Sequence, residues 1–237
     1  MNNQYKELAQ EIKKSKYTIV LTGAGMSTES GLSDFRSPTG IWKEFDPMKV
    51  ATINALVNDY ENFHKFYSLR GKSNVTAMPH QGHYILAKWE ELGLIKGIIT
   101  QNVDDFHKAA GSKNVYNLHG SIREFQCFSC GEESTKEAFI DKEACKVCGG
   151  RLRPNIVLFG ESLPVDVLEK SVIDIKKAEL VLVIGTSLTV YPAAGLHKRA
   201  SGKVVYINSE YENNKKFHMV ILGKAGEILK SVDSFID

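Results

Sequence analysis

Short apolar runs recur along the chain, and four of them have the length and composition of buried β-strands. They occupy residues 17–22, 97–100, 180–185 and 203–207. Three of the four are almost continuously apolar, which is typical of parallel strands that helices cover on both faces. Segments with helical character lie at 1–16, 83–92, 166–177 and 225–231. The pattern therefore predicts an α/β fold built on a doubly wound parallel sheet.

Glycines and polar residues follow each predicted strand. These segments are Gly23-Ala24-Gly25, Gln101-Asn102, Gly185-Thr186-Ser187 and Asn208-Ser209. In open α/β sheets, ligands bind in the crevice beyond the carboxyl ends of the strands. We therefore expect the four segments to converge on one ligand site.

Composition narrows the class of protein. The chain has 237 residues, enough for one large domain with a smaller satellite. Its 30 basic and 28 acidic residues form no long run of one sign, so no nucleic-acid partner is expected. No apolar stretch approaches the roughly 18 residues that span a bilayer, so no membrane association is expected. The polar N-terminal segment lacks the apolar core of a signal peptide, which predicts a cytoplasmic protein.

All four cysteines lie in two C-x-x-C pairs separated by fourteen residues, Cys127/Cys130 and Cys145/Cys148. Two such pairs supply the four thiolates of a tetrahedral zinc site. Disulfides are disfavoured in a reducing compartment, and a catalytic zinc usually keeps one position open for water. The spacing therefore predicts one closed, structural zinc site.

Two stretches, 37–75 and 121–153, do not follow the strand–helix alternation. We predict that they form a small lobe with a helical part and a zinc ribbon. The remaining segments, 1–36, 76–120 and 154–237, then form the large domain.

The turn after the first strand contains half of a dinucleotide-binding fingerprint. Gly23 and Gly25 match the first two glycines of G-x-G-x-x-G, but Thr28 occupies the position of the third. Glycines after a buried strand let the backbone approach a phosphate, and a following helix adds a favourable dipole. No acidic residue ends a second strand to bind a ribose, so an ordinary dehydrogenase is a poor fit.

Six segments together resemble the successive motifs of the sirtuin family. They are GAGMSTESGLSDFRS, TQNVDDFHKAAGS, NLHGS, the paired C-x-x-C, RPNIVLFGESLP and GTSLTVYPAAGL. The resemblance runs from about Tyr17 to Asn208. It implies a Rossmann-like large domain, a zinc-containing small lobe, and NAD⁺-dependent removal of acyl groups from protein lysines. In that reaction NAD⁺ is consumed, and the products are nicotinamide, O-acyl-ADP-ribose and free lysine.

The resemblance also implies roles for individual residues. His119 matches the catalytic base, and Asn102 matches a second residue at the reaction centre. The predicted NAD-binding residues are Gly23, Ala24, Gly25, Thr28, Phe35, Arg36, Gln101, Val103, Asp104, Gly185, Thr186, Ser187 and Asn208. The acylated peptide is expected to add as a strand beside Phe159, Gly160, Glu161 and Val190.

Structural roles compete with some of these assignments. The other six histidines are expected to be structural. Asp105 is expected to be a helix cap, and Thr186 and Ser187 are alternatively caps of the next helix. Ser33 and Met26 differ from the usual family residues, although neither change removes a reactive group.

The acyl chain is the main open point. Sirtuins that prefer succinyl or malonyl lysine carry Tyr-x-x-Arg in the small lobe, and Tyr67 and Arg70 have this spacing. Counting from Pro79 places Arg70 outside the pocket, as an ordinary solvated helix residue. We therefore predict a preference for acetyl or similar neutral groups.

Two other classes of function use a similar site: a mono-ADP-ribosyltransferase and a non-catalytic NAD- or zinc-binding module. His119 favours deacylation over the transferase, and the presence of every matched polar residue argues against the binding module.

Overall fold

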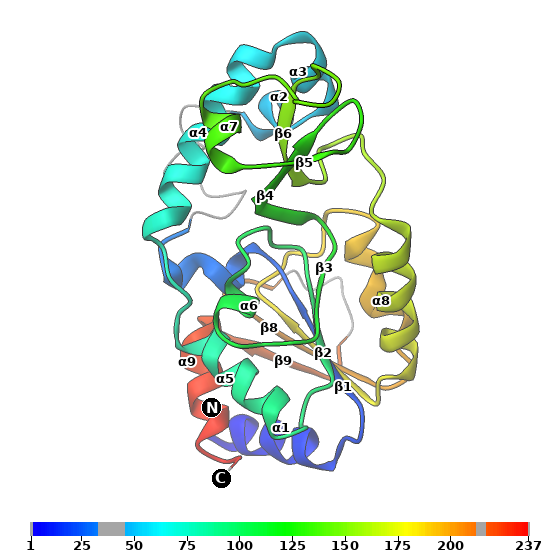
Figure 1. Cartoon of the computed structure of the whole chain (residues 1–237). Coiled ribbons are helices and arrows are strands. Elements are labelled where there is room, and N and C mark those ends of the chain that lie inside the picture. The colour runs from blue at the N-terminus through cyan, green and yellow to red at the C-terminus, as the bar shows by residue number, and fades with distance from the viewer. Residues whose placement is uncertain (1, 33–45, 212–216, 237) are drawn as a thin grey trace.

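The computed structural model describes residues 2–32, 46–211 and 217–236. Two sheets organise these residues, one with six strands and one with three. We call the six-stranded sheet and its helices the large lobe, and the three-stranded sheet and its helices the small lobe. The small lobe lies above the large lobe in Figure 1, and the N- and C-termini lie together at the opposite end.

The large-lobe sheet is entirely parallel, with strand order β3-β2-β1-β7-β8-β9. Its strands are β1 (Thr18–Thr22), β2 (Gly97–Thr100), β3 (Val115–Asn117), β7 (Leu180–Ile184), β8 (Lys203–Asn208) and β9 (Met219–Leu222). The chain adds strands on one side of β1 and then on the other, so the order reverses between β1 and β7. Ligands bind at such a switch point in doubly wound sheets. The predicted fold class is confirmed.

Helices cover both faces of this sheet. They are α1 (Asn2–Lys14), α5 (Gln81–Glu91), α6 (Phe106–Ala109), α8 (Val165–Lys177) and α9 (Ala225–Asp233), with 3₁₀ helices η1 (Ala24–Ser30) and η3 (Ala193–Arg199). Alternate residues of β1 serve two cores: Val20 packs with α1, α5 and α9, whereas Ile19 and Leu21 pack with α8 and η3. This two-sided burial explains why the central strands are apolar throughout.

The small lobe is formed by two separate segments of the chain. Its helices are α2 (Pro47–Val50), α3 (Ile53–Asn58), α4 (Tyr60–Thr76) and α7 (Lys136–Ile140), and its antiparallel strands are β4 (Gly120–Cys127), β5 (Glu133–Ser134) and β6 (Leu152–Ile156). Aromatic residues dominate its core, where Phe63 and Phe66 of α4 are fully buried together with Phe139 of α7. The domain boundaries given above stay a prediction.

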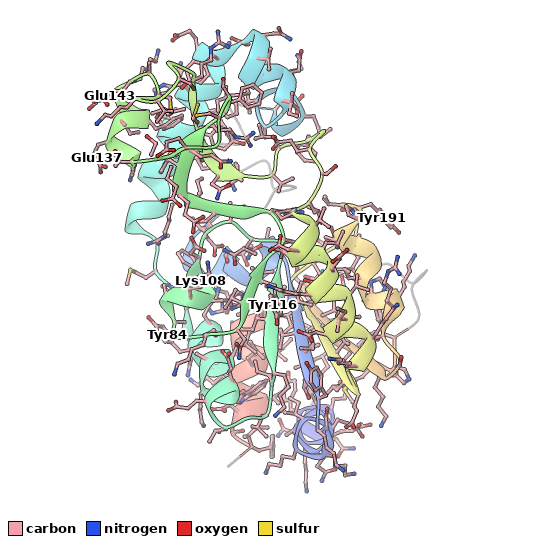
Figure 2. All side chains as sticks on the ribbon, turned by 45° about the vertical axis from the view of Figure 1, so that its right-hand side comes forward. Tyr84, Lys108, Tyr116, Glu137, Glu143 and Tyr191 are labelled. Atoms are coloured by element: carbon pink, nitrogen blue, oxygen red, sulfur yellow. The ribbon has the colours of Figure 1, made fainter. Side chains whose placement is uncertain are left out.

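The surface of the small lobe is polar where α7 faces solvent. Phe139 on the inner side of this helix is buried, while Glu137 of the helix and Glu143, which follows it, are exposed (Figure 2). None of the helices in the described parts of the chain combines the length and apolar character needed to cross a bilayer.

Candidate active site

A cavity of about 710 Å³ opens at the carboxyl ends of β1, β2 and β7, and residues of both lobes line it. Every predicted NAD, catalytic and peptide residue in the described part of the chain lines this cavity. They are Gly23, Ala24, Gly25, Thr28, Gln101, Asn102, Val103, Asp104, His119, Phe159, Gly160, Glu161, Gly185, Thr186, Ser187, Val190 and Asn208. Phe35 and Arg36 lie outside the described residues. The predicted strand ends therefore do meet at one site.

The glycine turn packs directly against the end of β7. A Cβ atom on Gly23 would lie 2.6 Å from the Cβ of Thr186, and one on Gly25 would lie 2.8 Å from the carbonyl oxygen of Gly185. The Gly25 N–H also donates to that carbonyl at 2.7 Å. Because β1 and β7 are adjacent strands, their two turns touch, and this contact demands both glycines even before any phosphate is considered.

The segment after this turn is the 3₁₀ helix η1, which begins inside the motif at Ala24. The sequence interpretation expected a following helix whose dipole would favour a phosphate. A seven-residue 3₁₀ helix supplies less of that dipole than a long α-helix. Backbone approach through Gly23 and Gly25 is therefore the stronger contribution.

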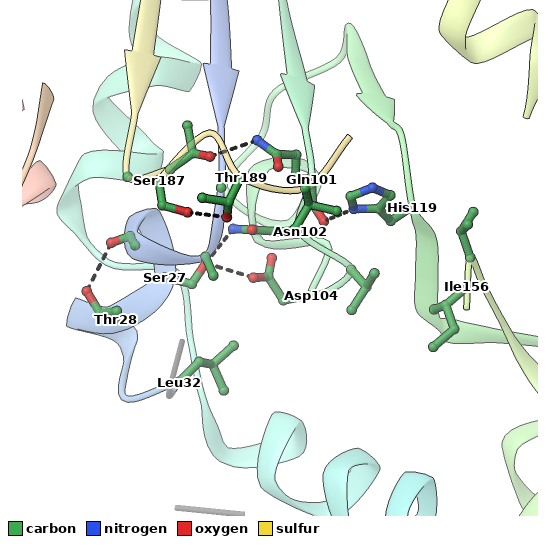
Figure 3. A pocket seen from close by; sticks show the side chains of 18 of the residues that line it. Ser27, Thr28, Leu32, Gln101, Asn102, Asp104, His119, Ile156, Ser187 and Thr189 are labelled. Carbon is green, nitrogen blue, oxygen red and sulfur yellow. Dashed lines mark hydrogen bonds between the residues drawn. The ribbon is translucent and has the colours of Figure 1, made fainter. Parts of the chain in front are cut away.

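A buried polar network joins η1 to the end of β2. The Ser27 hydroxyl donates to Asp104 at 2.7 Å and accepts from the Asn102 amide at 3.1 Å (Figure 3). Ser27 was absent from the predicted site, although its place in the glycine turn could have indicated it. Burial raises the pKa of the Asp104 carboxyl, and hydrogen bonds from the Phe106 N–H and Ser27 oppose the shift. Both Asn102 and Asp104 are thereby held in fixed positions at the cavity wall.

His119 lies between β3 and β4, at the junction of the two lobes. Its Nδ1 atom is 2.7 Å from the carbonyl oxygen of Gln101, which can only accept a hydrogen bond (Figure 3). Nδ1 therefore carries the hydrogen in the neutral ring, and Nε2 is left with its lone pair. Burial lowers the pKa of His119 below its ordinary value, and the bond to Gln101 opposes this shift. The side chain is therefore a neutral base at pH 7.

The Gln101 side chain and the end of β8 extend the site. The Gln101 amide donates to Thr186 Oγ1 at 3.0 Å, and the Asn208 amide donates to the Tyr206 hydroxyl at 2.8 Å. Tyr206 in turn donates to the Thr186 carbonyl at 2.8 Å. Three strand ends, β2, β7 and β8, are linked through Thr186.

The competing helix-cap assignment of Thr186 and Ser187 is wrong, and that of Asp105 is confirmed in position but not in its side-chain bond. The helix after β7 begins at Ala193, with Pro192 at its N-cap, so Thr186 and Ser187 are too distant to cap it. Asp105 does occupy the N-cap position of α6, but its carboxylate accepts from Asn117 and Ser121 instead. The Phe106 N–H is capped by Asp104, because Asp105 has a left-handed backbone with φ of 63°.

The predicted peptide-binding segment after β6 is held firmly in place. The Phe159 N–H donates to the Ala51 carbonyl at 2.9 Å. The Glu161 carboxylate pairs with the buried Arg153 and accepts from the Leu158 N–H at 2.7 Å. On the opposite side, Val190 and Tyr191 are exposed at 42% and 66%, so this edge of the cavity is open to a partner (Figure 2).

Tyr67 and Arg70 both line the cavity, so the placement of Arg70 outside it was wrong. Tyr67 is buried on α4, and burial raises its pKa to about 12. Burial lowers the pKa of Arg70, and the neighbouring Tyr67 and Asp104 oppose the shift. Counting residues from Pro79 failed because the face of α4 that meets the cavity is set by its packing against β4, β6 and α7.

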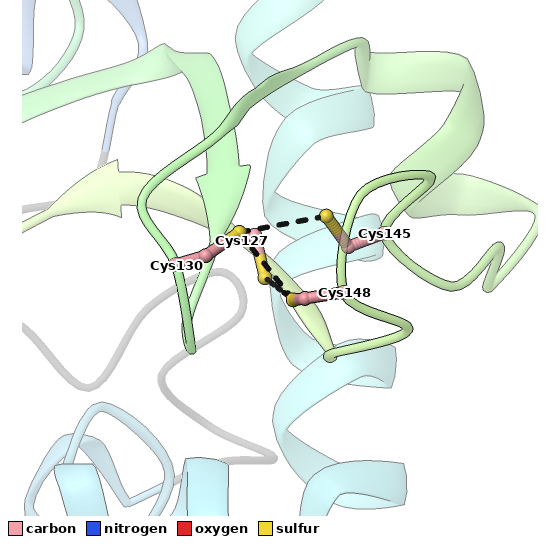
Figure 4. Close-up of side chains that lie close together, drawn as sticks. All are labelled: Cys127, Cys130, Cys145 and Cys148. Atoms are coloured by element: carbon pink, nitrogen blue, oxygen red, sulfur yellow. Dashed lines mark hydrogen bonds between the residues drawn. The ribbon is translucent and has the colours of Figure 1, made fainter.

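The four cysteines form a compact cluster in the small lobe (Figure 4). Their sulfur atoms all lie within 4.8 Å of one another, with Cys127–Cys148 and Cys130–Cys148 at 3.4 Å and Cys130–Cys145 at 3.7 Å. Tetrahedral zinc with bonds of about 2.3 Å separates its sulfur ligands by about 3.8 Å. Gly131 and Gly149 follow the two pairs with positive φ angles of 75° and 72°. The cluster fits one zinc ion and no disulfide is formed.

Comparison with known proteins agrees with this geometry. The model of the Sir2 family matches residues 23–192. The NAD-dependent protein deacetylase of Oceanobacillus iheyensis is 45% identical over 94% of this chain and 97% of its own length. The NAD-dependent protein deacylase of Pyrococcus furiosus is 42% identical over 94% of each chain.

Solved structures give the same result. A Sir2 homologue in complex with NAD superposes with a TM-score of 0.90 at 38% identity, over 97% of this chain and 93% of that one. A Sir2 structure with a p53 peptide and NAD⁺ has a TM-score of 0.87 at 35% identity, over 96% of each chain. Because the family model matches most of the chain and the relatives align over nearly its whole length, this chain belongs to the Sir2 family.

Proposed function

We propose that this protein uses NAD⁺ to remove acyl groups, mostly acetyl, from lysine side chains of proteins. The observation that carries the proposal is the position of His119. It lines the same cavity as the glycine turn, with Nδ1 bonded to Gln101 and Nε2 able to take up a proton. The two relatives described above are named NAD-dependent protein deacetylase and NAD-dependent protein deacylase.

Each part of the cavity has a task in this reaction. NAD⁺, when bound, supplies the ribose that receives the acyl group and the nicotinamide that leaves. Gly23 and Gly25 let the backbone approach its phosphates, and Asn102 and Asp104 orient the reacting ribose. His119 removes a proton from a ribose hydroxyl, which makes this oxygen a better nucleophile toward the acyl carbon.

The cavity also has to exclude water while the acyl group is transferred. Residues of the two lobes enclose it, from Gly25 on one side to Phe159 on the other. The acyl-lysine peptide is proposed to add as a strand beside residues 159–161 and Val190, where backbone bonds would hold it with little demand on its sequence. We also propose that the protein works in the cytoplasm and without nucleic acid, which its nearly balanced charge and its thiol-based metal site support.

Mass spectrometry of an acetylated peptide incubated with NAD⁺ tests this function. We expect loss of the acetyl group together with nicotinamide and O-acetyl-ADP-ribose. A peptide that gains ADP-ribose while keeping its acetyl group would establish the transferase instead. Absence of any nicotinamide release would establish a non-catalytic binding module.

A second candidate function, removal of succinyl or malonyl groups, is favoured by Tyr67 and Arg70. Both residues line the cavity, and a guanidinium and a buried phenol suit a terminal carboxylate. A charge-assisted hydrogen bond in such a place contributes about 1.5–3 kcal/mol, which corresponds to about 10- to 100-fold in kcat/KM.

Arg70→Met separates the two acyl preferences. If the acidic group is a true substrate, this variant should lose about 10- to 100-fold in kcat/KM for a succinyl peptide and little for an acetyl peptide. Tyr67→Phe removes only the hydroxyl and serves as the milder comparison. An equal effect of Arg70→Met on both peptides would restrict the function to neutral acyl groups.

A further inference from the structure

The helix η1 is held through two residues that do not line the cavity. The carbonyl oxygen of Met26 lies 2.6 Å from Nε2 of His80, which immediately precedes α5. The Glu29 carboxylate accepts a hydrogen bond of 2.7 Å from the N–H of Gly226, in the first turn of α9. Other residues of η1, among them Gly25, Ser27 and Thr28, form the cavity wall. The residues of η1 that line the cavity are therefore held in position by hydrogen bonds of Met26 and Glu29, which face away from the cavity.

His80 makes its two bonds in one tautomer only. Nδ1 accepts from the N–H of Gly82 at 3.0 Å and so cannot carry a hydrogen. Nε2 must then carry the hydrogen and donate it to Met26, because a carbonyl oxygen can only accept. His80 thus joins the start of α5 to η1 through its two ring nitrogens.

Two glycines allow α5, α9 and η1 to approach one another closely. A Cβ atom on Gly226 would lie 2.7 Å from Nδ1 of His80 and 2.9 Å from Oε1 of Glu29. A Cβ atom on Gly82 would lie 3.2 Å from the Cα of Gly226. Helix α9 packs against both α5 and η1, and α5 and α9 are neighbours in Figure 1. We call His80, Gly82, Glu29 and Gly226 the α5–α9 junction.

The titratable groups around His80 are His83, His107 and Glu29. The rings of His80 and His83 are 4.4 Å apart, and those of His83 and His107 are 4.9 Å apart. Burial lowers the pKa of His83 to about 2 and that of His107 to about 3, with the neighbouring histidines adding to the shift. Both rings therefore stay neutral above pH 5.

We infer that His80 and Glu29 are positioning residues that hold η1 in the shape that binds NAD⁺. The inference rests on the proposed NAD site. Neither residue lines the cavity. Their effect is transmitted by the carbonyl of Met26 and by the start of α9.

Calorimetric titration with ADP-ribose tests the inference, because this probe lacks nicotinamide and requires no turnover. His80→Ala removes two hydrogen bonds and should raise the Kd about tenfold. His80→Asn keeps an acceptor and a donor on a shorter side chain and should recover part of the loss. The Kd for an acetyl-lysine peptide should stay unchanged in both variants.

His64→Ala is the matched control. His64 makes the same kind of bond, from Nε2 to the Phe139 carbonyl at 2.6 Å, but within the small lobe. This variant should lower the melting temperature and leave the Kd for ADP-ribose unchanged. If His80→Ala does not fold, Gly226→Ala replaces it, because its added methyl displaces both His80 and Glu29.

Wild-type affinity for ADP-ribose in His80→Ala or Gly226→Ala would overturn the positioning role. Failure of the wild type to bind ADP-ribose would instead overturn the proposed function.

Discussion

The two lobes of this protein are stabilised in different ways. In the large lobe, β1, β2 and β7 are buried at every position, and apolar clusters cover both faces of the sheet. In the small lobe, the sheet has three strands, one of them only two residues long, and a single core. Cys127 and Cys145 belong to that core.

This difference shows where each lobe obtains its stability. A parallel sheet covered on both faces buries enough apolar surface to be stable alone. A lobe with a short antiparallel sheet buries too little, and a bound metal supplies the remainder. Removing the metal, removing the proposed base His119 or protonating the buried histidines should therefore affect different parts of the molecule.

Zinc removal should have the largest effect. Structural zinc contributes about 10–16 kcal/mol of apparent binding free energy, which is as large as the typical free energy of unfolding of a whole domain, about 5–15 kcal/mol. After chelation or in Cys145→Ser, hydrogen exchange should become fast in β4, β6 and α7 and stay slow in β1 and β7. Deacylation should stop. Unchanged protection of the small lobe in the metal-free protein would contradict the comparison.

His119→Ala should remove chemistry and leave both lobes folded. General-base catalysis contributes about 10²–10⁴ in rate, so kcat should fall by this factor with little change in melting temperature. Because burial lowers the pKa of His119, the wild-type rate should stay level as pH falls from 8 to 6.5 and decline only below that. Full deacylation by the alanine variant would show that the base is another group.

Low pH should lower the free energy of unfolding of the large lobe, by less than zinc removal lowers that of the small lobe. Burial holds the folded-state pKa values of His83 and His107 near 2 and 3, against about 6.5 when unfolded. The unfolded chain therefore binds more protons below pH 6.5. The resulting stability is complete above pH 6.5 and is lost as the pH falls, by about 2 kcal/mol per histidine at pH 5.

His83→Phe tests this assignment. Neither ring nitrogen of His83 has a hydrogen-bond partner among the described residues, so a benzyl ring should replace it with little loss. Urea unfolding at pH 7 and pH 5 should then show about half the wild-type loss of stability. An equal loss in the variant and the wild type would assign the acid sensitivity to other groups.

Local patterns were sufficient for much of this molecule. The central strands were predicted to within one residue because burial on both faces leaves a continuous apolar run. The zinc cysteines were predicted by spacing alone, since each pair binds from one tight turn. The edge strands β3 and β9 were missed because they are short and only partly buried, so neither alternation nor a long apolar run marks them.

The remaining features depend on contacts between distant segments. Gly23 and Gly25 are needed where β1 and β7 meet, and Ser27 acquires its partners only when η1 reaches the end of β2. Arg70 lines the cavity because the packing of α4 sets which face of that helix the cavity meets. The sequence by itself determined the kinds of element, the metal ligands and the family, since these are written in residue types and short spacings. Only the tertiary structure decided that Arg70 lines the cavity and that His80 and Gly226 hold η1 in place. These features depend on contacts between residues that lie tens of positions apart along the chain.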